Sequence, residues 1–152
     1  MSKLDELRRS YELLSGLLET EIAAANPQKA RALLRCQDSL DLAFFALAWG
    51  QFEHLVNERT NGIIREKAKE KGYNGLAWRW ASSNRPTLRQ RLELAFLGKP
   101  SVILQLLRAY DTRNKIVHEY MRGIGKSLPD DIGGWIGHLE SLVSDTDTGL
   151  AE

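Results

Sequence analysis

Cysteine is almost absent from this sequence of 152 residues, which contains only Cys36. A single cysteine excludes an intramolecular disulfide, and it is typical of proteins from a reducing compartment. Free cysteines are usually buried, where they act as small apolar residues. We therefore expect Cys36 to lie in the core.

Long apolar runs are absent too. The most apolar stretch, LAFFALAW at residues 42–49, is far too short to span a bilayer. The chain begins with MSKLDELRRS, which is charged and has neither a long apolar centre nor a small-residue cleavage site, so no signal peptide is expected. These features predict a cytoplasmic protein with no membrane partner.

Neither sign of charge is in clear excess. Lys and Arg total 21 and Asp and Glu total 20, for a formal net charge of +1. Proteins that wrap long duplex nucleic acid need a broadly basic surface, so the balance argues against that class but leaves room for a local basic site. The sequence also lacks a Gly-rich phosphate loop, a His/Cys metal spacing and an evident Ser–His–Asp order, so we predict no metal and no cofactor.

Helical periodicity is the pattern that the sequence does contain. Apolar residues recur at steps of three and four along most of the chain, and no strand-like alternation persists. We predict an all-α fold, an up-and-down bundle of four to five helices. The length fits one domain over residues 1–145, followed by a frayed polar tail at 146–152.

Caps and breakers divide the first part of the chain into two helices. The spacing predicts a helix over 3–24, and Asn26 with Pro27 forms a stop followed by a new start. The second helix is expected from about residue 27 to 58, and further if the Asn61-Gly62 pair does not break it. Its middle is apolar on nearly all sides, which places it at the centre of the bundle.

The remaining elements follow one substantial loop. The stretch GYNGLAWRWASSNRP, residues 72–86, is rich in Gly, Asn and Ser and is expected to be that loop. Helices are expected over 86–98 and 100–122, and a last helix follows a cap formed by Ser127 and Asp130.

The helix predicted from 100 to 122 has one interruption in its apolar stripe. The stripe comprises Ile103, Leu106, Leu107, Tyr110, Val117, Tyr120 and Met121. Arg113 and Asn114 fill the gap in this stripe, and His118 follows one turn after Asn114 at its edge. A buried polar group without a partner costs about 1–3 kcal/mol, and a buried arginine costs more unless an anion meets it. This face must therefore meet an internal acid, another subunit or an anionic ligand.

The spacing of Arg113 and His118 suggests a second copy of the chain. Five residues correspond to about 140° around a regular helix, so the two side chains cannot both point into one narrow pocket on their own helix. A second helix packed across a two-fold axis would bring arginines and histidines from both chains into one cleft. We therefore hypothesise a homodimer with a shared site.

The stretch RNKIVHEY, residues 113–120, resembles the motif of HEPN domains, in which an arginine and a polar residue, often asparagine, precede a histidine. Tyr120, two places after the histidine, is similar to the variant in HEPN toxins that pair with small nucleotidyltransferase antitoxins. AWGQFEHLV, residues 48–56, is similar to the aromatic-plus-Glu stretch on an early helix of such domains. The resemblance extends over about residues 38–145 and implies a HEPN-like helical bundle.

The resemblance also implies metal-independent cleavage of RNA, whose own 2′-hydroxyl is the nucleophile. His118 would act as the base for that hydroxyl or as the acid for the leaving 5′-oxygen, since imidazoles serve in both roles. Arg113 would brace the charged phosphorane, and Asn114 would orient His118 or the phosphate. Cleavage would leave a 2′,3′-cyclic phosphate, and AMP transferred to Tyr120 by a partner nucleotidyltransferase would block the cleft.

Each of these residues also has a structural alternative. Arg113 and His118 would then form an ion-pair network inside the bundle, and Asn114 would only fix helix register. Tyr120 would belong to the core or to an interface. Glu53 falls on the buried side of the second helix, where it would balance Arg113, tune His118 or pair with a nearby lysine.

A second basic cluster precedes the helix predicted at 86–98 and extends into it. It comprises Arg79, Arg85, Arg89 and Arg91, which surround Trp78 and Trp80. Arginines with aromatic side chains can stack on and clamp single-stranded RNA. The alternative is a loop that the two tryptophans anchor, with its charges in solvent.

The sequence as a whole favours a HEPN ribonuclease that acts as a homodimer, of the kind found as toxins in toxin–antitoxin or phage-defence pairs. The alternative is a non-catalytic HEPN module that binds a nucleotidyltransferase or another protein, and a third hypothesis is a plain helical scaffold. Arg113 and His118 favour the first, because a docking module needs neither residue.

Overall fold

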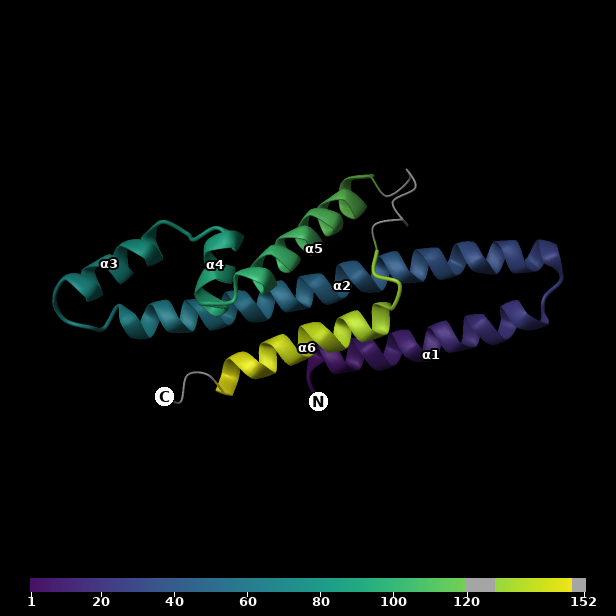
Figure 1. Cartoon of the computed structure of the whole chain (residues 1–152), viewed down its shortest axis with the longest axis horizontal. Coiled ribbons are helices and arrows are strands. Elements are labelled where there is room, and N and C mark those ends of the chain that lie inside the picture. The colour runs from purple at the N-terminus through teal and green to yellow at the C-terminus, as the bar shows by residue number, and fades with distance from the viewer. Residues whose placement is uncertain (120–127, 149–152) are drawn as a thin grey trace.

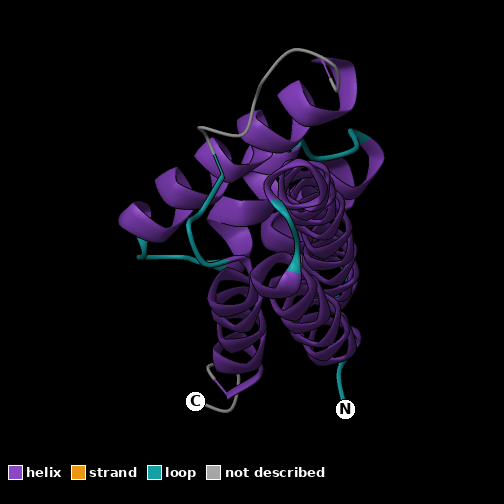
Figure 2. Ribbon diagram, turned by 90° about the vertical axis from the view of Figure 1, so that its right-hand side faces the viewer, coloured by secondary structure: helices purple, strands orange, loops and turns teal. Residues whose placement is uncertain are grey.

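Six α-helices make up the part of the chain that the computed structural model describes, residues 1–119 and 128–148 (Figure 1). They are α1 (Lys3–Ala24), α2 (Pro27–Lys67), α3 (Gly72–Ser83), α4 (Leu88–Ala95), α5 (Pro100–Glu119) and α6 (Ile132–Thr148). Figure 2 shows helices and connecting loops, with no strand over these residues. The all-α prediction is confirmed, but the described helices outnumber the four to five expected.

α1 and α2 form a long helical hairpin (Figure 1). The turn is fixed as the sequence predicts: Asn26 Oδ1 accepts a hydrogen bond from the Lys29 amide at 2.9 Å, and Pro27 occupies the first position of α2. This pairing satisfies a backbone N–H that the start of a helix otherwise leaves unpaired. The bounds of α1 also match the predicted 3–24.

α2 continues past its predicted end at residue 58. It runs for 41 residues to Lys67, and Asn61 and Gly62 do not break it. A glycine inside a helix costs only about 1 kcal/mol relative to alanine. Burial of Thr60 and Ile64, which flank the pair, offsets that cost.

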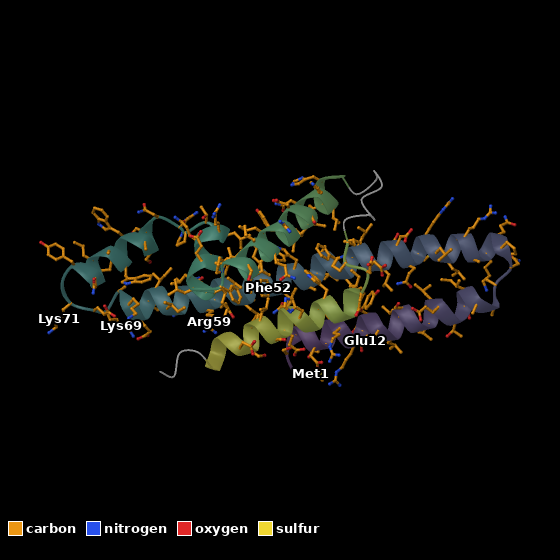
Figure 3. The ribbon with its side chains drawn as sticks, in the orientation of Figure 1. Met1, Glu12, Phe52, Arg59, Lys69 and Lys71 are labelled. Atoms are coloured by element: carbon orange, nitrogen blue, oxygen red, sulfur yellow. The ribbon has the colours of Figure 1, made fainter. Side chains whose placement is uncertain are left out.

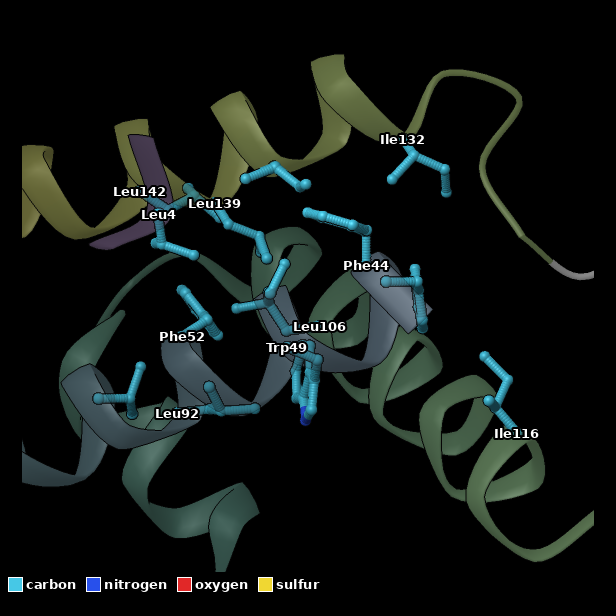
Figure 4. Packing of buried hydrophobic residues seen from close by; sticks show 14 of the residues in the cluster. Leu4, Phe44, Trp49, Phe52, Leu92, Leu106, Ile116, Ile132, Leu139 and Leu142 are labelled. Atoms are coloured by element: carbon cyan, nitrogen blue, oxygen red, sulfur yellow. The ribbon is translucent and has the colours of Figure 1, made fainter. Parts of the chain in front are cut away.

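The middle of α2 is the centre of the core, as its apolar sequence predicts. α2 contacts each of the other five described helices. Trp49 and Phe52 are fully buried, and the ring of Phe45 stacks on that of Trp135 from α6 with centroids 4.3 Å apart. Figure 4 shows side chains of α2, α5 and α6 packed together at this level. Full burial of one such side chain contributes about 1.5–3 kcal/mol, so this stretch holds α5 and α6 against α2.

The closed end of the α1–α2 hairpin extends beyond the other helices (Figure 1). Each helix there packs mainly against the other, so much of its surface faces solvent. Cys36 lies near this end of α2 and is exposed, as is Leu34. The prediction that Cys36 is a core residue is wrong, because no third helix covers this part of α2.

The stretch 72–86 is mostly helical, so the prediction of a loop there is wrong. Gly72 has a φ of +77°, which lets the chain turn sharply out of α2 into α3. Gly75 is buried against the end of α2, where any side chain would collide with the carbonyl oxygen of Glu70. Gly72 therefore permits the turn and Gly75 the close approach, and the residues that follow Gly75, Leu76 to Trp80, sustain the helix.

Side-chain caps define the starts of α4 and α6. Thr87 forms a capping box with Gln90 at the start of α4. Asp131 Oδ1 accepts a hydrogen bond from the Gly134 amide at 2.8 Å, so the carboxylate that caps α6 is Asp131 and not Asp130. Ser127, the other half of the predicted cap, lies outside the described residues. α6 continues to Thr148, so the helical part passes the predicted domain end at 145.

Candidate functional site

α5 carries Arg113 on the side that faces the core. On a regular helix Arg113 lies about 20° from Leu106 and about 60° from Ile116, and both of those side chains are buried. Arg113 itself is half-buried, and its Nε atom is fully enclosed. The apolar face of α5 is therefore interrupted at Arg113, as the sequence indicates.

The buried face of α5 continues through Ile116 and not through Val117. Ile116 is 3% exposed and Val117 is 52% exposed, so the placement of Val117 in the apolar stripe is wrong. α5 diverges from α2 toward its C-terminal end (Figure 1). A helix that crosses its neighbour at an angle presents a slightly different face at each turn, and here the contact moves onto Ile116. Tyr120 and Met121, the last members of the predicted stripe, lie outside the described residues.

Arg113 and Asn114 contact each other directly. Arg113 Nη1 donates a hydrogen bond to Asn114 Oδ1 at 3.1 Å. Within residues 1–119 and 128–148 no carboxylate forms an ion pair with Arg113, and its Nε has no hydrogen-bond partner. The alternative role of Arg113, in an ion-pair network inside the bundle, therefore has no carboxylate partner among the described residues. A guanidinium with unused donors is suited to bind an anion.

His118 is exposed in the last described turn of α5. It follows Asn114 by one turn, about 40° around the helix, so Asn114 lies between Arg113 and His118 on the helix surface. We call these three residues the α5 motif. The motif extends from the core-facing side of α5 to its solvent-facing side, and in one chain Arg113 and His118 point in different directions.

Glu53 does not contact the α5 motif through an ion pair. It is half-buried on α2, and among the described residues no ion pair joins it to Arg113, to His118 or to a lysine. Its neighbour His54 is exposed, with Nε2 3.6 Å from Glu58 Oε1. No ion pair among the described residues therefore supports the role predicted for Glu53.

A second buried donor lies next to the α5 motif. The ring of Trp49 is fully buried and lies 6.2 Å from that of Tyr110, which precedes Asn114 by one turn. Trp49 Nε1 has no hydrogen-bond partner among the described residues. An unpaired buried N–H costs about 1–3 kcal/mol. The buried side of this region thus offers donors without acceptors.

Five well-formed pockets over the described residues lie away from the α5 motif, and α5 lines none of these five. A second surface opposite α5 would supply a cleft that holds a phosphodiester at Arg113 and His118.

A basic pocket lies where α2, α3 and α4 meet. Its volume is about 530 Å³, and four arginines line it: Arg65 of α2, Arg79 of α3, Arg85 of the connection and Arg91 of α4. The other lining residues are Asn61, Ile64, Ala68, Ser82, Ser83 and Pro86, so the wall contains no Asp or Glu. We call this the arginine pocket.

The arginine pocket contains only part of the predicted RNA-binding set. Of the predicted basic cluster, Arg79, Arg85 and Arg91 line it, whereas Arg89 lies outside and its Nε pairs with Glu93 at 3.1 Å. Trp78 lines a neighbouring pocket of about 360 Å³. Trp80 is 69% exposed, so it does not anchor the segment, and the alternative of a loop held by two tryptophans is wrong at this residue.

Arg65 is the pocket residue that sequence reasoning missed. It comes from α2, beyond the predicted end of that helix at residue 58. The signal was present: Asn61, Arg65 and Ala68 recur at steps of four and three, which places them on one face of a helix. That face becomes visible only when α2 is taken as unbroken through Gly62.

Among the described residues no three or more His, Cys, Asp and Glu side chains are grouped so that they could hold a metal ion. No helix in this part of the chain combines the length and apolar character that crossing a membrane needs. Comparison with protein-family models, with curated proteins and with solved structures finds no match to this chain.

Proposed function

We propose that this protein is a metal-independent endoribonuclease of the HEPN type that acts as a homodimer. The main support is Arg113, a guanidinium on the core-facing side of α5 that is hydrogen-bonded to Asn114 and paired with no described carboxylate. His118 is exposed one turn after Asn114. α5 thus presents the two groups that RNA cleavage needs, a cation for the phosphate and an imidazole for proton transfer.

In the proposed reaction the 2′-hydroxyl of one nucleotide attacks the adjacent phosphorus. His118 accepts the hydroxyl proton, the bond from phosphorus to the 5′-oxygen breaks, and the imidazolium so formed donates a proton to that oxygen. The products are a 2′,3′-cyclic phosphate and a 5′-hydroxyl. Arg113 stabilises the charge that develops on the phosphorane oxygens, and Asn114 orients the guanidinium through its hydrogen bond.

The homodimer supplies what a single copy of α5 lacks. Arg113 and His118 point about 140° apart on their own helix, and the five well-formed pockets of the described residues lie away from α5. α5 also exposes apolar side chains: Val117, directly before His118, is 52% exposed, and Leu104, near the start of the helix, is 57% exposed. Contact between two copies would bury these residues and close a cleft over both motifs.

A ribonuclease of this type would slow the growth of its host unless a partner restrains it. The motif suggests a nucleotidyltransferase antitoxin that transfers AMP to Tyr120, a residue outside the described part of the chain. The bulky anion would occupy the cleft where the RNA phosphate binds.

RNA cleavage in EDTA tests this proposal. We expect the purified protein to cut single-stranded RNA and to leave 2′,3′-cyclic phosphate ends, and we expect His118→Ala and Arg113→Ala to lose about 10²–10⁴-fold in rate. Matched controls are His138→Ala and Arg108→Ala, which remove an exposed histidine and an exposed arginine elsewhere. Equal rates for wild type and both α5 variants would refute the proposal, and loss of activity in EDTA would indicate a metal enzyme.

The alternative function, a non-catalytic module that docks a nucleotidyltransferase or another protein, is favoured by one observation. Tyr73, Leu76 and Trp80 are 91%, 45% and 69% exposed and share one face of α3. Exposed apolar patches of this kind often mark protein contacts. The same experiment separates the two functions, since a docking module predicts no cleavage by any variant.

A further inference from the structure

The arginine pocket concentrates positive charge that its own wall does not neutralise. Arg65, Arg79, Arg85 and Arg91 come from four different segments and meet around one cavity without a lining carboxylate. Like charges held together raise the local potential and attract anions from solution. The chain as a whole is close to neutral, with a formal net charge of +1, so this concentration is local.

Two of the four arginines hold the pocket together. Arg91 Nη1 donates to Thr60 Oγ1 and Asn61 Oδ1, both at 2.8 Å, which fastens α4 to α2. Arg79 Nη1 donates to the carbonyl oxygen of Ala68 at 3.0 Å, which fastens α3 to the end of α2. The walls are therefore positioned by hydrogen bonds between helices.

The other two arginines have no such role. Arg65 and Arg85 are exposed, and neither forms a hydrogen bond or an ion pair with a side chain or backbone group of residues 1–119 and 128–148. Their donors are available to a ligand. Guanidinium groups suit phosphate well, because their donors match two phosphate oxygens at once.

Arg85 also adopts a backbone conformation that arginine disfavours. Its φ is +48°, in the left-handed region, directly after Asn84 at the C-terminal cap of α3. Glycine or asparagine usually occupies such a position because a larger side chain costs free energy there. A function for the Arg85 side chain in the arginine pocket would account for an arginine at this strained position.

We propose that the arginine pocket binds phosphate groups of an RNA strand, at the end of the molecule away from the α5 motif. The choice of RNA as the source of the phosphates rests on the proposed function. α5 runs away from α3, so the pocket and the motif contact different parts of one strand (Figure 1). The site holds substrate and takes no part in proton transfer, because none of its lining residues is a histidine.

The surroundings of the pocket favour a single strand. Trp80 is 69% exposed on α3 and lies about 60° around that helix from Ser83, which lines the pocket. Unpaired bases stack on exposed aromatic rings of this kind. Lys71 is exposed and lies with Lys69 at the same end of the molecule, where α2 gives way to α3 (Figure 3).

Binding of a 2′-O-methyl RNA of about 16 nucleotides tests the proposal, because this RNA lacks the nucleophile and cannot be cut. Fluorescence anisotropy gives the Kd over a range of salt concentrations. We expect Arg65→Gln/Arg85→Gln to weaken binding about tenfold and to lower the salt slope by about two. The matched control Arg89→Gln/Arg108→Gln removes the same charge outside the pocket, and we expect it to bind nearly as wild type does. Equal affinity of the two double variants would overturn the proposal.

Arg85→Gly separates binding from folding. Glycine accepts the left-handed conformation, so we expect a Tm at or above that of wild type together with weaker RNA binding. Weaker binding with a lower Tm would mean that Arg85 is structural and would count against the pocket.

Competition with ATP and with inorganic triphosphate distinguishes the sources of phosphate. Displacement of the RNA only at high concentrations of both supports an RNA site. Tight binding of ATP without binding of the oligonucleotide would overturn the RNA assignment. Failure of the two proposals is also distinguishable: binding through the pocket without any cleavage refutes only the ribonuclease, and cleavage with unchanged binding by Arg65→Gln/Arg85→Gln refutes only the pocket.

Discussion

The α5 motif and the arginine pocket are both basic, but each has what the other lacks. The motif includes His118 and lines none of the five well-formed pockets of the described residues, whereas the arginine pocket has a volume of about 530 Å³ and no histidine. Proton transfer near neutral pH needs a group such as imidazole, while a guanidinium stays charged and holds anions. We therefore assign chemistry to α5 and the holding of substrate to the end of the molecule at α3.

The largest expected effect is on the rate of cleavage by His118→Ala. We expect kcat to fall about 10²–10⁴-fold, while the Kd for 2′-O-methyl RNA stays within about twofold of wild type, because the imidazole transfers protons and contributes little to holding RNA. Single-turnover cleavage and anisotropy measure the two quantities, with His138→Ala as the control. A variant that binds poorly and still turns over at the wild-type rate would reverse the assignment.

A second prediction concerns the packing under the α5 motif. Ile116→Ala should lower the free energy of unfolding by about 2–5 kcal/mol, because it leaves a cavity in the core. Val117→Ala, one residue further along, should change it by less than about 0.5 kcal/mol, because Val117 is 52% exposed. Urea denaturation of the two variants measures the difference. Similar losses for both would mean that α5 buries a different face.

A third prediction is a split between KM and kcat at the arginine pocket. Arg65→Gln/Arg85→Gln should raise KM for RNA about tenfold and leave kcat unchanged, since contacts made equally in the ground state and the transition state affect binding alone. Steady-state cleavage of a labelled RNA gives both constants. A fall in kcat would mean that the arginine pocket also contributes to the chemical step, which would contradict the division of roles between the two regions.

The smallest expected effect is on folding stability at alkaline pH, and it comes from Tyr11, which lies in neither region. Burial, together with a hydrogen bond of 2.8 Å to Asp41, raises the pKa of Tyr11 to about 12. The pKa of an unfolded tyrosine is about 10. Stability from Tyr11 is therefore full below about pH 10 and is lost as pH rises toward 12.

The alkaline dependence of Tm tests this assignment. Wild type should lose stability between about pH 10 and 12 more steeply than Tyr11→Phe, which has no hydroxyl to ionise. Identical alkaline slopes for the two proteins would show that Tyr11 is not the group that titrates.

Local patterns in the sequence predicted the parts of the fold that depend on neighbours along the chain. The cap at Asn26 with Pro27, the bounds of α1 and the central place of α2 were all predicted correctly. In each case the relevant partner lies within a few residues or along one helix, so periodicity and capping chemistry are sufficient.

The errors arose where distant helices decide the outcome. Among the described residues no third helix covers the part of α2 that carries Cys36, and Ile116 replaces Val117 in the core because α5 diverges from α2. The error at Gly75 was local, because this glycine lets α3 approach the carbonyl oxygen of Glu70 in the connection just before it. Crossing angles and the length of the hairpin are tertiary features that no single helix encodes.

The two candidate sites differ in the same way. The interruption of the apolar face at Arg113 was readable from one helix, and the structure contains it. Three arginines of the arginine pocket, Arg79, Arg85 and Arg91, belong to the cluster that the sequence predicted, but Arg65 joins them from α2, beyond the predicted end of that helix. Predicting such a pocket needs the three-dimensional fold.

The most direct test of the shared site mixes two inactive protomers. The Arg113→Ala and His118→Ala variants are given different affinity tags and are refolded together. The heterodimer is then isolated through both tags and assayed for RNA cleavage in EDTA. If Arg113 of one protomer acts with His118 of the other, the heterodimer keeps one of the two Arg113–His118 pairs of the shared cleft, and we expect about half of the wild-type rate per dimer. A heterodimer as inactive as its parents, or full activity from a monomeric wild type, would contradict a site built across the two-fold axis.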